Sequence, residues 1–329
     1  MRIFRHPRDI PDGFRGGIVA IGNFDGVHLG HQALMAEARR LADERKTTFD
    51  VLAFEPHPQE FFHPGGECFR LTPFRTKARL IAAQGADAMF ALAFDAEMAA
   101  KSAQDFIGEV LIEGVGAGAV VVGADFQFGK GRAGNTAVLA YMGEMEGLGV
   151  TIFQPVEDER HGKISSSRIR EALKGGRPDE AARLLGHYWT VESRVEHGDE
   201  RGRTIGIPTA NMHIHGYLAP AFGVYAVRVT IMEDDRPAGT YEAVANLGIR
   251  PMFEVQKPLL ETWLFDFSGD LYGKHLAVEF VAWLRPEARF ADLGALKSQI
   301  EADAQGAREA LKNRQDHESP TLDGPSARC

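Results

Sequence analysis

Residues 22–31, which read GNFDGVHLGH, combine a flexible backbone with two imidazole side chains. Glycines let the backbone approach a ligand closely, and the N–H groups at a helix start favour an anion. His28 and His31 share one helical face, so both can reach the same phosphate. The alternative is a tight turn capped by Asp25, with solvated histidines. We interpret the turn as a phosphate-binding site whose other candidate residues are Gly22, Asn23, Phe24, Asp25 and Gly26.

Three consecutive serines mark a second candidate site. Residues 164–170 read ISSSRIR and begin a predicted helix. One serine is enough to cap a helix, so two hydroxyls remain for another role. Basic side chains lie beside them, and hydroxyls together with cations bind polyanions well. We predict that Ser165, Ser166, Ser167 and Arg170 hold phosphate groups, with a plain helix cap as the alternative.

Two other glycine-rich stretches do not match known phosphate-binding loops. A P-loop has the pattern GxxxxGK[ST], whereas residues 123–131 have five residues between the glycines and a glycine after the lysine. Residues 114–118 precede a predicted strand, whereas the dinucleotide fingerprint follows one. We therefore exclude both interpretations.

The first half of the chain alternates apolar runs with helical patterns. This alternation predicts an α/β fold with a doubly wound parallel sheet, which binds ligands at the carboxyl ends of its strands. Asp125 and Phe126 come just after one such strand, where a ligand would be contacted. The predicted strands are residues 18–21, 48–54, 88–94, 119–122 and 150–155, and the predicted helices are residues 32–44, 75–84, 103–112, 136–148, 168–174 and 178–185.

The pattern changes at residue 187, where strands with turn signals begin. Five or six antiparallel strands and one final helix, residues 293–312, predict a small closed barrel. A Ser-Gly-Asp turn at residues 268–270 predicts a hairpin between the last two strands. The polar residues 313–329 are expected to be disordered. The predicted strands are residues 188–195, 223–232, 241–245, 260–267 and 276–284.

Composition limits the class of protein. The 329 residues suffice for two domains, and the 44% hydrophobic and 25% charged content is ordinary for a globular protein. A net charge of −9 argues against nucleic-acid partners. Two cysteines are too few for a disulfide framework, and no signal core or stretch of eighteen apolar residues is present. We expect a cytoplasmic protein without a membrane partner, and a homo-oligomer is left open.

The motifs resemble those of a known family. HLGH at residues 28–31 and ISSSRIR at residues 164–170 are similar to the HxGH and ISSTxxR signatures of the nucleotidyltransferase superfamily. FEPHP at residues 54–58 and GADFQFG at residues 123–129 resemble those of the bacterial bifunctional riboflavin kinase/FAD synthetase family. GIPTAN at residues 206–211 resembles that family's GxPTAN motif, and LET at residues 260–262 its base-bearing strand. The resemblance covers about residues 15 to 310. It implies an HxGH-type FMN adenylyltransferase domain at residues 1–184 and a β-barrel riboflavin kinase domain at residues 185–312.

The resemblance implies a kinase reaction in the barrel. The 5′-hydroxyl of riboflavin attacks the γ-phosphate of ATP, and Glu261 would be the general base. Thr209 and Asn211 offer oxygen ligands for Mg²⁺ bridging the phosphates. Gly206 and Pro208 belong to the same nucleotide-binding motif. From the residues alone, a turn leading to a strand and a solvated strand carboxylate stay open.

The resemblance also implies an adenylyl transfer in the first domain. The phosphate of FMN attacks the α-phosphate of a second ATP, giving FAD and pyrophosphate. His28 and His31 would stabilise the developing charge, while the serine motif with Arg170 holds the triphosphate. Phe128 would stack on an aromatic ring, or it is a core phenylalanine.

Some positions depart from the family pattern. Met252 replaces a threonine, Trp263 a common histidine, Ser193 a frequent glycine and Ser167 a threonine. Three other functions therefore stay open besides the bifunctional enzyme. They are an adenylyltransferase whose barrel only binds flavin, a flavin-responsive binding module without activity, and another small-molecule nucleotidyltransferase.

Overall fold

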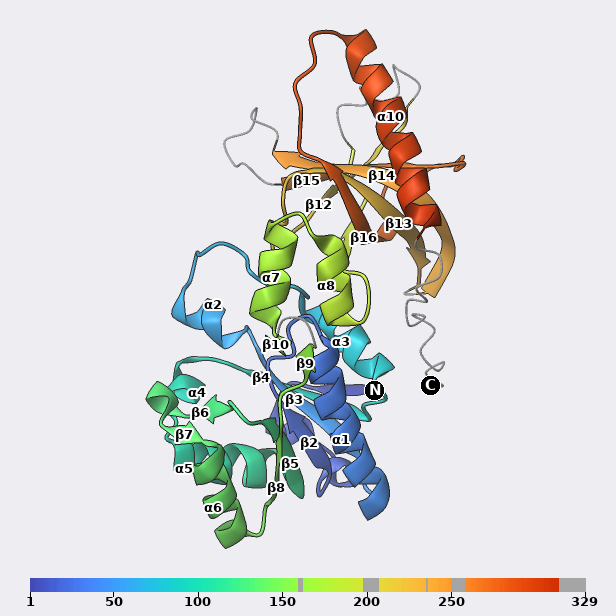
Figure 1. Cartoon of the computed structure of the whole chain (residues 1–329). Coiled ribbons are helices and arrows are strands. Elements are labelled where there is room, and N and C mark those ends of the chain that lie inside the picture. The colour runs from blue at the N-terminus through green and yellow to red at the C-terminus, as the bar shows by residue number, and fades with distance from the viewer. Residues whose placement is uncertain (159–161, 198–206, 235, 250–257, 314–329) are drawn as a thin grey trace. The chain divides into compact units, whose positions relative to one another are not determined.

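The computed structural model describes residues 1–158, 162–197, 207–234, 236–249 and 258–313 (Figure 1). Contacts divide the chain into two compact units. Among the described residues, the first unit comprises Met1–Glu67 and Phe74–Ser165, and the second comprises Cys68–Pro73 and residues 166–313. The predicted domain boundary after residue 184 stays a prediction, as does the disordered tail, of which residues 314–329 lie outside the described part of the chain.

The first unit contains a six-stranded sheet in which every pairing is parallel, as predicted. The strand order is β1-β4-β3-β2-β5-β8. Short runs rich in valine and isoleucine form the buried strands β2 and β5 in its middle. The sequence prediction missed β1, a three-residue strand at the edge of the sheet. The strands are β1 Arg2–Phe4, β2 Ile18–Ile21, β3 Phe49–Glu55, β4 Ala88–Ala93, β5 Ala119–Gly123 and β8 Gly149–Phe153.

Helices cover both faces of this sheet. Alternate strand residues pack against α1 and α3 on one face, and the others pack against η3 and α6 on the opposite face. The helix predicted at residues 103–112 is a short α-turn continued by a π-helix, η3, to Val115. The helices are η1 Pro7–Asp9, η2 Asp12–Phe14, α1 Leu29–Arg45, α2 Pro58–Phe62, α3 Phe74–Ala83, α4 Ala96–Ala100, α5 Ala103–Asp105, η3 Phe106–Val115, η4 Lys130–Arg132 and α6 Thr136–Glu146. Two small ribbons complete the unit, β6 Gln127–Phe128 with β7 Gly134–Asn135 and β9 Glu157–Asp158 with β10 Gly162–Lys163.

The second unit contains six antiparallel strands in the order β11-β16-β13-β14-β15-β12. The two edge strands meet where the Glu196 N–H donates to the Asn211 carbonyl at 2.9 Å, which brings the sheet close to a closed barrel. The predicted barrel is confirmed. The strands are β11 Thr190–Arg194, β12 Ala210–His213, β13 Gly223–Glu233, β14 Arg236–Ile249, β15 Pro258–Leu264 and β16 His275–Arg285.

The predicted hairpin between the last two strands is wrong. Strand β15 pairs with β14 and β12, whereas β16 pairs with β11 and β13. The Ser-Gly-Asp turn lies within a longer connection, which starts where the Phe265 N–H donates to Glu242 and ends where Lys274 accepts from the Val195 N–H. The strand predicted at residues 241–245 is also too short, because its pairing with β13 continues well before and after those residues.

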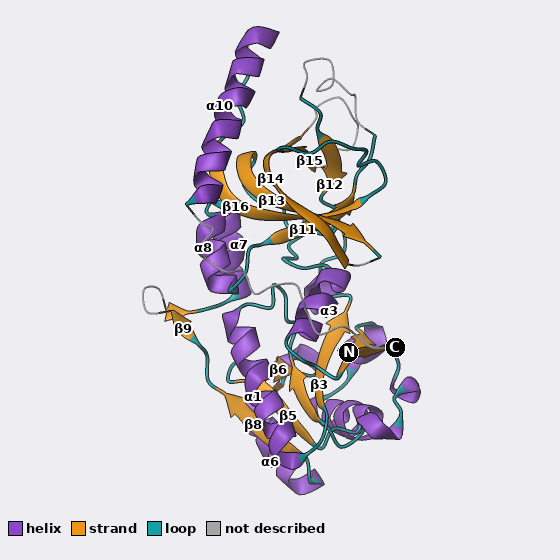
Figure 2. Cartoon of the chain, turned by 90° about the vertical axis from the view of Figure 1, so that its right-hand side faces the viewer, coloured by secondary structure: helices purple, strands orange, loops and turns teal. Residues whose placement is uncertain are grey.

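Among its described residues, the second unit has the helices α7 Ser166–Lys174, α8 Pro178–Leu185 and α10 Leu293–Lys312. Helix α10 lies along β13, β14 and β16 of the barrel (Figure 2). Asp303 of α10 accepts two hydrogen bonds from the Arg285 guanidinium, at 2.8 and 2.6 Å, and this pair fixes the helix on β16. In the part of the chain that the structure describes, no helix has the length and apolarity needed to cross a membrane.

Candidate active sites

The turn after β2 lies at the switch point of the parallel sheet. From β2 the strands proceed to β3 and β4 on one side, and β5 and β8 lie on the other. Ligands of doubly wound sheets bind where the strand order reverses in this way. The register pairs Ala20 with Val121, so Gly22, just after β2, lies level with Gly123 at the end of β5. The sequence prediction thus placed both candidate loops at the correct edge.

The backbone of this turn is held in an uncommon conformation. Phe24, Gly26 and Val27 have φ values of 50°, 86° and 44°. A β-branched residue such as Val27 rarely adopts a positive φ, and tertiary contacts must enforce it. Phe24 and Val27 are buried in the core, and the Gln32 side chain donates to the Val27 carbonyl at 2.8 Å. The turn is therefore preformed.

His28 and His31 stack on each other at the start of helix α1. Their ring centroids lie 3.5 Å apart with an interplanar angle of 15°. His28 is the helix N-cap, and its Nδ1 accepts the His31 N–H at 3.2 Å. This bond leaves the proton of a neutral His28 on Nε2. Gly30 permits the stack, because a Cβ there would lie 3.2 Å from the His28 ring.

The imidazole of His31 is uncharged at neutral pH. Burial lowers its pKa well below the ordinary value, and repulsion from His28 and from Lys77 adds to the effect. Its Nδ1 is buried and, among the described residues, has no hydrogen-bond partner. A neutral imidazole can still donate one hydrogen bond to a phosphate oxygen, from its protonated nitrogen.

The loop after β5 carries the next candidates. The Lys163 ammonium lies 2.5 Å from the Asp125 carboxylate, and this hydrogen bond lowers the pKa of the carboxyl. Phe126 stacks on Phe128 with 5.4 Å between ring centroids. Phe128 is buried and also contacts Phe106, so it packs in the core, whereas Phe126 is partly exposed.

Sequence reasoning missed an aromatic cluster at the same edge of the sheet. Phe61 and Phe62 of α2 contact Phe94, which follows β4, with ring centroids 5.5 and 5.8 Å away. Phe54 at the end of β3 contacts Phe94 at 5.7 Å, and Phe62 is largely exposed. The signal in the sequence was the run FEPHPQEFF directly after a buried strand.

The serine motif is divided between the two units. Ser165 ends the first unit, next to Ile164, whose carbonyl oxygen lies 3.8 Å from the Cβ position of Gly30. Ser166 and Ser167 begin helix α7 of the second unit. There the Arg170 Nε donates to the Phe69 carbonyl at 2.8 Å, and the guanidinium lies over the Phe69 ring.

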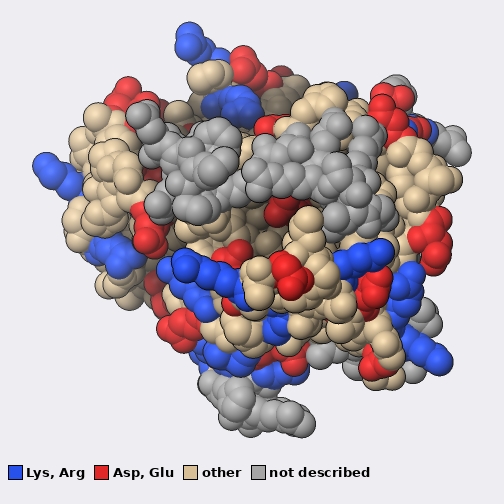
Figure 3. All heavy atoms as spheres, turned by 90° about the horizontal axis from the view of Figure 1, so that it is seen from above, with Lys and Arg blue, Asp and Glu red and all other residues tan. Residues whose placement is uncertain are grey.

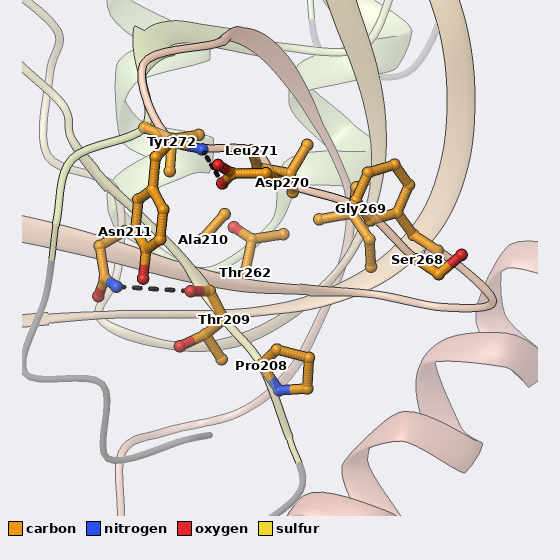
Figure 4. Close-up of a pocket in the computed structure, with 13 residues that line it drawn as sticks. Pro208, Thr209, Ala210, Asn211, Thr262, Ser268, Gly269, Asp270, Leu271 and Tyr272 are labelled. Atoms are coloured by element: carbon orange, nitrogen blue, oxygen red, sulfur yellow. Dashed lines mark hydrogen bonds between the residues drawn. The ribbon is translucent and has the colours of Figure 1, made fainter. Parts of the chain in front are cut away.

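The barrel contains a cavity of about 480 Å³. Residues 208–211, at the start of β12, line one side of it, and the connection between β15 and β16 forms another wall (Figure 4). Thr262 of β15 also belongs to the lining; it is fully buried, and its hydroxyl has no hydrogen-bond partner among the described residues. The lining residues are Val195, Pro208, Thr209, Ala210, Asn211, Thr262, Leu264, Phe267, Ser268, Gly269, Asp270, Leu271 and Tyr272.

Three of the four described residues predicted for the kinase site line this cavity: Pro208, Thr209 and Asn211. The Asn211 amide nitrogen lies 3.5 Å from the Thr209 carbonyl, so the amide oxygen is turned away from it (Figure 4). Gly206 and Met252 lie outside the described residues.

The fourth, Glu261, does not line the cavity but lies beside it on the sheet. Asn211 of β12 and Asn246 of β14 stand directly opposite Glu261 in the two ladders. Residues opposite one another in an antiparallel ladder project to the same face. The carboxylate therefore shares a face with two amides, of which the sequence prediction missed Asn246. Trp263, two residues on, contacts Phe265 and packs on the cluster around α10.

Comparisons with known proteins match both units. The FAD synthetase family model matches residues 11–168, and the riboflavin kinase model matches residues 185–311. The bifunctional riboflavin kinase/FMN adenylyltransferase of Pseudomonas fluorescens is 40% identical over 309 residues, 94% of this chain and 97% of its own length. This chain belongs to that bifunctional family. The enzyme of the same name from Escherichia coli K12 is also 40% identical, over 89% of this chain and 92% of its own length.

One solved structure is similar over nearly the whole chain. It is described as a macrolide-efflux protein from Streptococcus pneumoniae, with 32% identity and a TM-score of 0.81, and it covers 93% of this chain and 98% of its own. The predicted family and enzyme class are confirmed by the family models and relatives. Enzymes of both classes use ATP with a divalent metal.

Proposed function

We propose that the chain makes FAD from riboflavin in two steps, one at each site. The barrel transfers a phosphate from ATP to riboflavin, and the switch-point turn transfers an adenylyl group from a second ATP to the resulting FMN. The stacked His28–His31 pair on a preformed glycine turn is the observation that carries the proposal, since it presents donors where a sheet of this order binds its ligand.

In the kinase step, the carboxylate of Glu261 takes the proton of the riboflavin 5′-hydroxyl. The hydroxyl oxygen attacks the γ-phosphorus of ATP, the bond to the bridging oxygen breaks, and ADP leaves. The cavity has the size of a nucleotide site, and Pro208, Thr209 and Asn211 of the predicted motif line it.

The donor set next to the cavity fits Mg²⁺. The hydroxyl of Thr209 and the amide oxygen of Asn211 are hard, neutral oxygen ligands. When bound, the ion neutralises charge on the ATP phosphates. Neutral ligands suit a metal that arrives with a polyanion, because the phosphates provide the remaining oxygens.

In the adenylyl step, an oxygen of the FMN phosphate attacks the α-phosphorus of ATP, and pyrophosphate leaves. His28 and His31 donate hydrogen bonds to the charge that develops, and the start of α1 adds its backbone N–H groups. Gly22, Asn23, Phe24, Asp25 and Gly26 keep the turn open to the triphosphate, which Ser165, Ser166, Ser167 and Arg170 hold. Asp125 and Phe126 contact the ligand at the switch point, and exposed Phe62 supplies a stacking surface for the flavin ring.

We also propose a cytoplasmic enzyme with small-molecule partners and no nucleic-acid partner. The net charge of −9 argues against a nucleic-acid partner. On the face in Figure 3, acidic and basic side chains are interspersed rather than gathered into one basic patch.

The test is to supply riboflavin with Mg²⁺ and ATP and to separate riboflavin, FMN and FAD. Glu261→Gln is expected to leave riboflavin unchanged but to convert supplied FMN to FAD. His28→Ala is expected to accumulate FMN without FAD. Glu301→Gln, an exposed change on α10, serves as the control and should form both products. The proposal fails if the wild type makes neither product, or if His28→Ala makes FAD at the normal rate.

A further inference from the structure

Lys77 is buried beneath the histidine turn of the first unit. It lies on α3, and only 2% of its side chain is exposed. Its Nζ is 3.4 Å from the carbonyl oxygen of Asn23 in the turn and 3.4 Å from a carboxylate oxygen of Glu55 at the end of β3. The ammonium thus connects the turn to the sheet.

Stability alone is a weak reason for this lysine. Burying an ion pair costs desolvation that its attraction often only offsets, and an apolar side chain of similar volume would fill the space as well. The contacts with Asn23 and Glu55, at 3.4 Å each, are long for hydrogen bonds. A buried charge beside a reactive group instead indicates an electrostatic role.

Lys77 also acts on His31 through space. Of the described titratable groups around His31, His28 stacks on its ring, Lys77 repels a proton on it, Glu55 faces Lys77, and Asp25 is buried in the same turn. The Nδ1 of His31 has no acceptor for a second proton among the described residues. Lys77 and His28 both favour the neutral imidazole.

We propose that Lys77 is a positioning residue for adenylyl transfer: it holds the turn through the Asn23 carbonyl and keeps His31 a neutral donor. A neutral His31 stays stacked on His28, whereas two charged rings at this distance would repel each other. The same ammonium adds positive charge below the phosphate site. Because it is buried, salt screens this charge less than it would screen a lysine on the surface. The inference rests on the proposed adenylyl transfer at this turn.

Three substitutions separate the charge from the contact. Lys77→Met removes both, Lys77→Gln keeps an amide donor for Asn23, and Lys77→Arg keeps the charge. The His31 ring is titrated by NMR in the full chain with labelled histidine, assigned with a His31→Asn variant. We expect wild-type His31 to stay neutral at pH values well below the ordinary pKa of histidine. The titration should move to higher pH in the Met and Gln variants and stay low in the Arg variant.

Activity provides the second measurement. We expect Lys77→Met to lower kcat/KM for ATP in FAD formation from FMN roughly tenfold or more, from a displaced turn and a lost charge. In this variant, the acidic limb of the pH profile of kcat/KM for FAD formation should move to higher pH, together with the titration of His31. FMN formation from riboflavin in the same chain should stay normal. Lys297→Met, an exposed change on α10 with the same loss of charge, should alter neither reaction nor the titration.

Two results would overturn the inference. One is an unchanged His31 titration in Lys77→Met and Lys77→Gln when both fold, as judged by thermal unfolding. The other is a normal FAD rate in Lys77→Gln, which would make the lysine a hydrogen-bonding spacer only. A wild type that forms no FAD would instead refute the proposed function, and the NMR titration would still decide the role of Lys77.

Discussion

Gly30→Ala should separate catalysis from folding in the first unit. Gly30 is the second residue of helix α1, and alanine there favours the helix by about 0.5–1 kcal/mol. The new Cβ would lie 3.2 Å from the His28 Cε1 and Nδ1. Carbon contacts settle at about 3.5–4.0 Å, so the ring must move by roughly 0.4 Å.

That movement affects both the helix cap and the position of a reacting group. The capping hydrogen bond from the His31 N–H is already 3.2 Å long, and its loss costs about 1 kcal/mol, which nearly cancels the helix gain. Misplacement of a reacting group by about 1 Å can cost about a hundredfold in rate, so a shift of ~0.4 Å predicts a loss of roughly tenfold. We therefore expect an unchanged melting temperature and slower FAD formation.

The assay follows FAD formation from FMN and ATP, with FMN formation from riboflavin as the internal reference. Gly108→Ala is the matched control, because it is a helical glycine of the same unit with nothing within 4 Å of its Cβ position. It should leave both rates unchanged. A normal FAD rate in Gly30→Ala would refute the argument that the glycine exists to admit the His28 ring.

Three further predictions concern stability and metal dependence. Asp303→Ala leaves the Arg285 guanidinium without its two-bond partner and should lower the free energy of unfolding by roughly 3 kcal/mol, measured by urea denaturation. Burial raises the pKa of Asp50 to about 7, so the native state binds a proton that the unfolded chain releases near pH 4, and stability falls as pH rises from about 4 to 7. Asp50→Asn should accordingly raise the melting temperature at pH 8 and change it little at pH 4. An equal gain at both pH values would contradict the argument that burial of the charged carboxylate is what destabilises the protein. Chelation of divalent metal should stop FMN formation and added Mg²⁺ should restore it, as product chromatography would show.

Local signals predicted several elements closely. Residues 18–21, 178–185 and 293–312 were predicted with the bounds that the structure has. The last two helices begin at Pro178 and after the capping Asp292, and Gly186 ends the first of them, so residue types alone mark these bounds. The switch-point turn was recognisable for the same reason, because its glycines and histidines are adjacent in the chain.

Features set by tertiary pairing were not predictable in this way. The turn at residues 268–270 suggests a hairpin, but barrel closure decides which strands pair. Asn246 meets Glu261 only through the register of β14 with β15. Lys77 stands between Arg75 and Arg79 in the sequence, where a solvated helix face is the ordinary interpretation, and its burial follows from how α3 packs on the sheet.

The two units solve one electrostatic problem differently. A chain of net charge −9 must bind ATP twice, so each site needs its own local attraction. In the barrel, the candidate ligands Thr209 and Asn211 are neutral, and attraction depends on the divalent metal that accompanies ATP. At the switch-point turn, burial lowers the pKa of His31 and so favours its neutral form, and we infer that the attraction comes from the start of α1 and from buried Lys77. Salt screens a buried lysine less than a surface charge. Raising the salt concentration should therefore weaken ATP binding at this turn less than it would weaken binding at a site built from surface lysines. A steep salt dependence of the KM for ATP in FAD formation would mean that exposed cations carry the attraction instead.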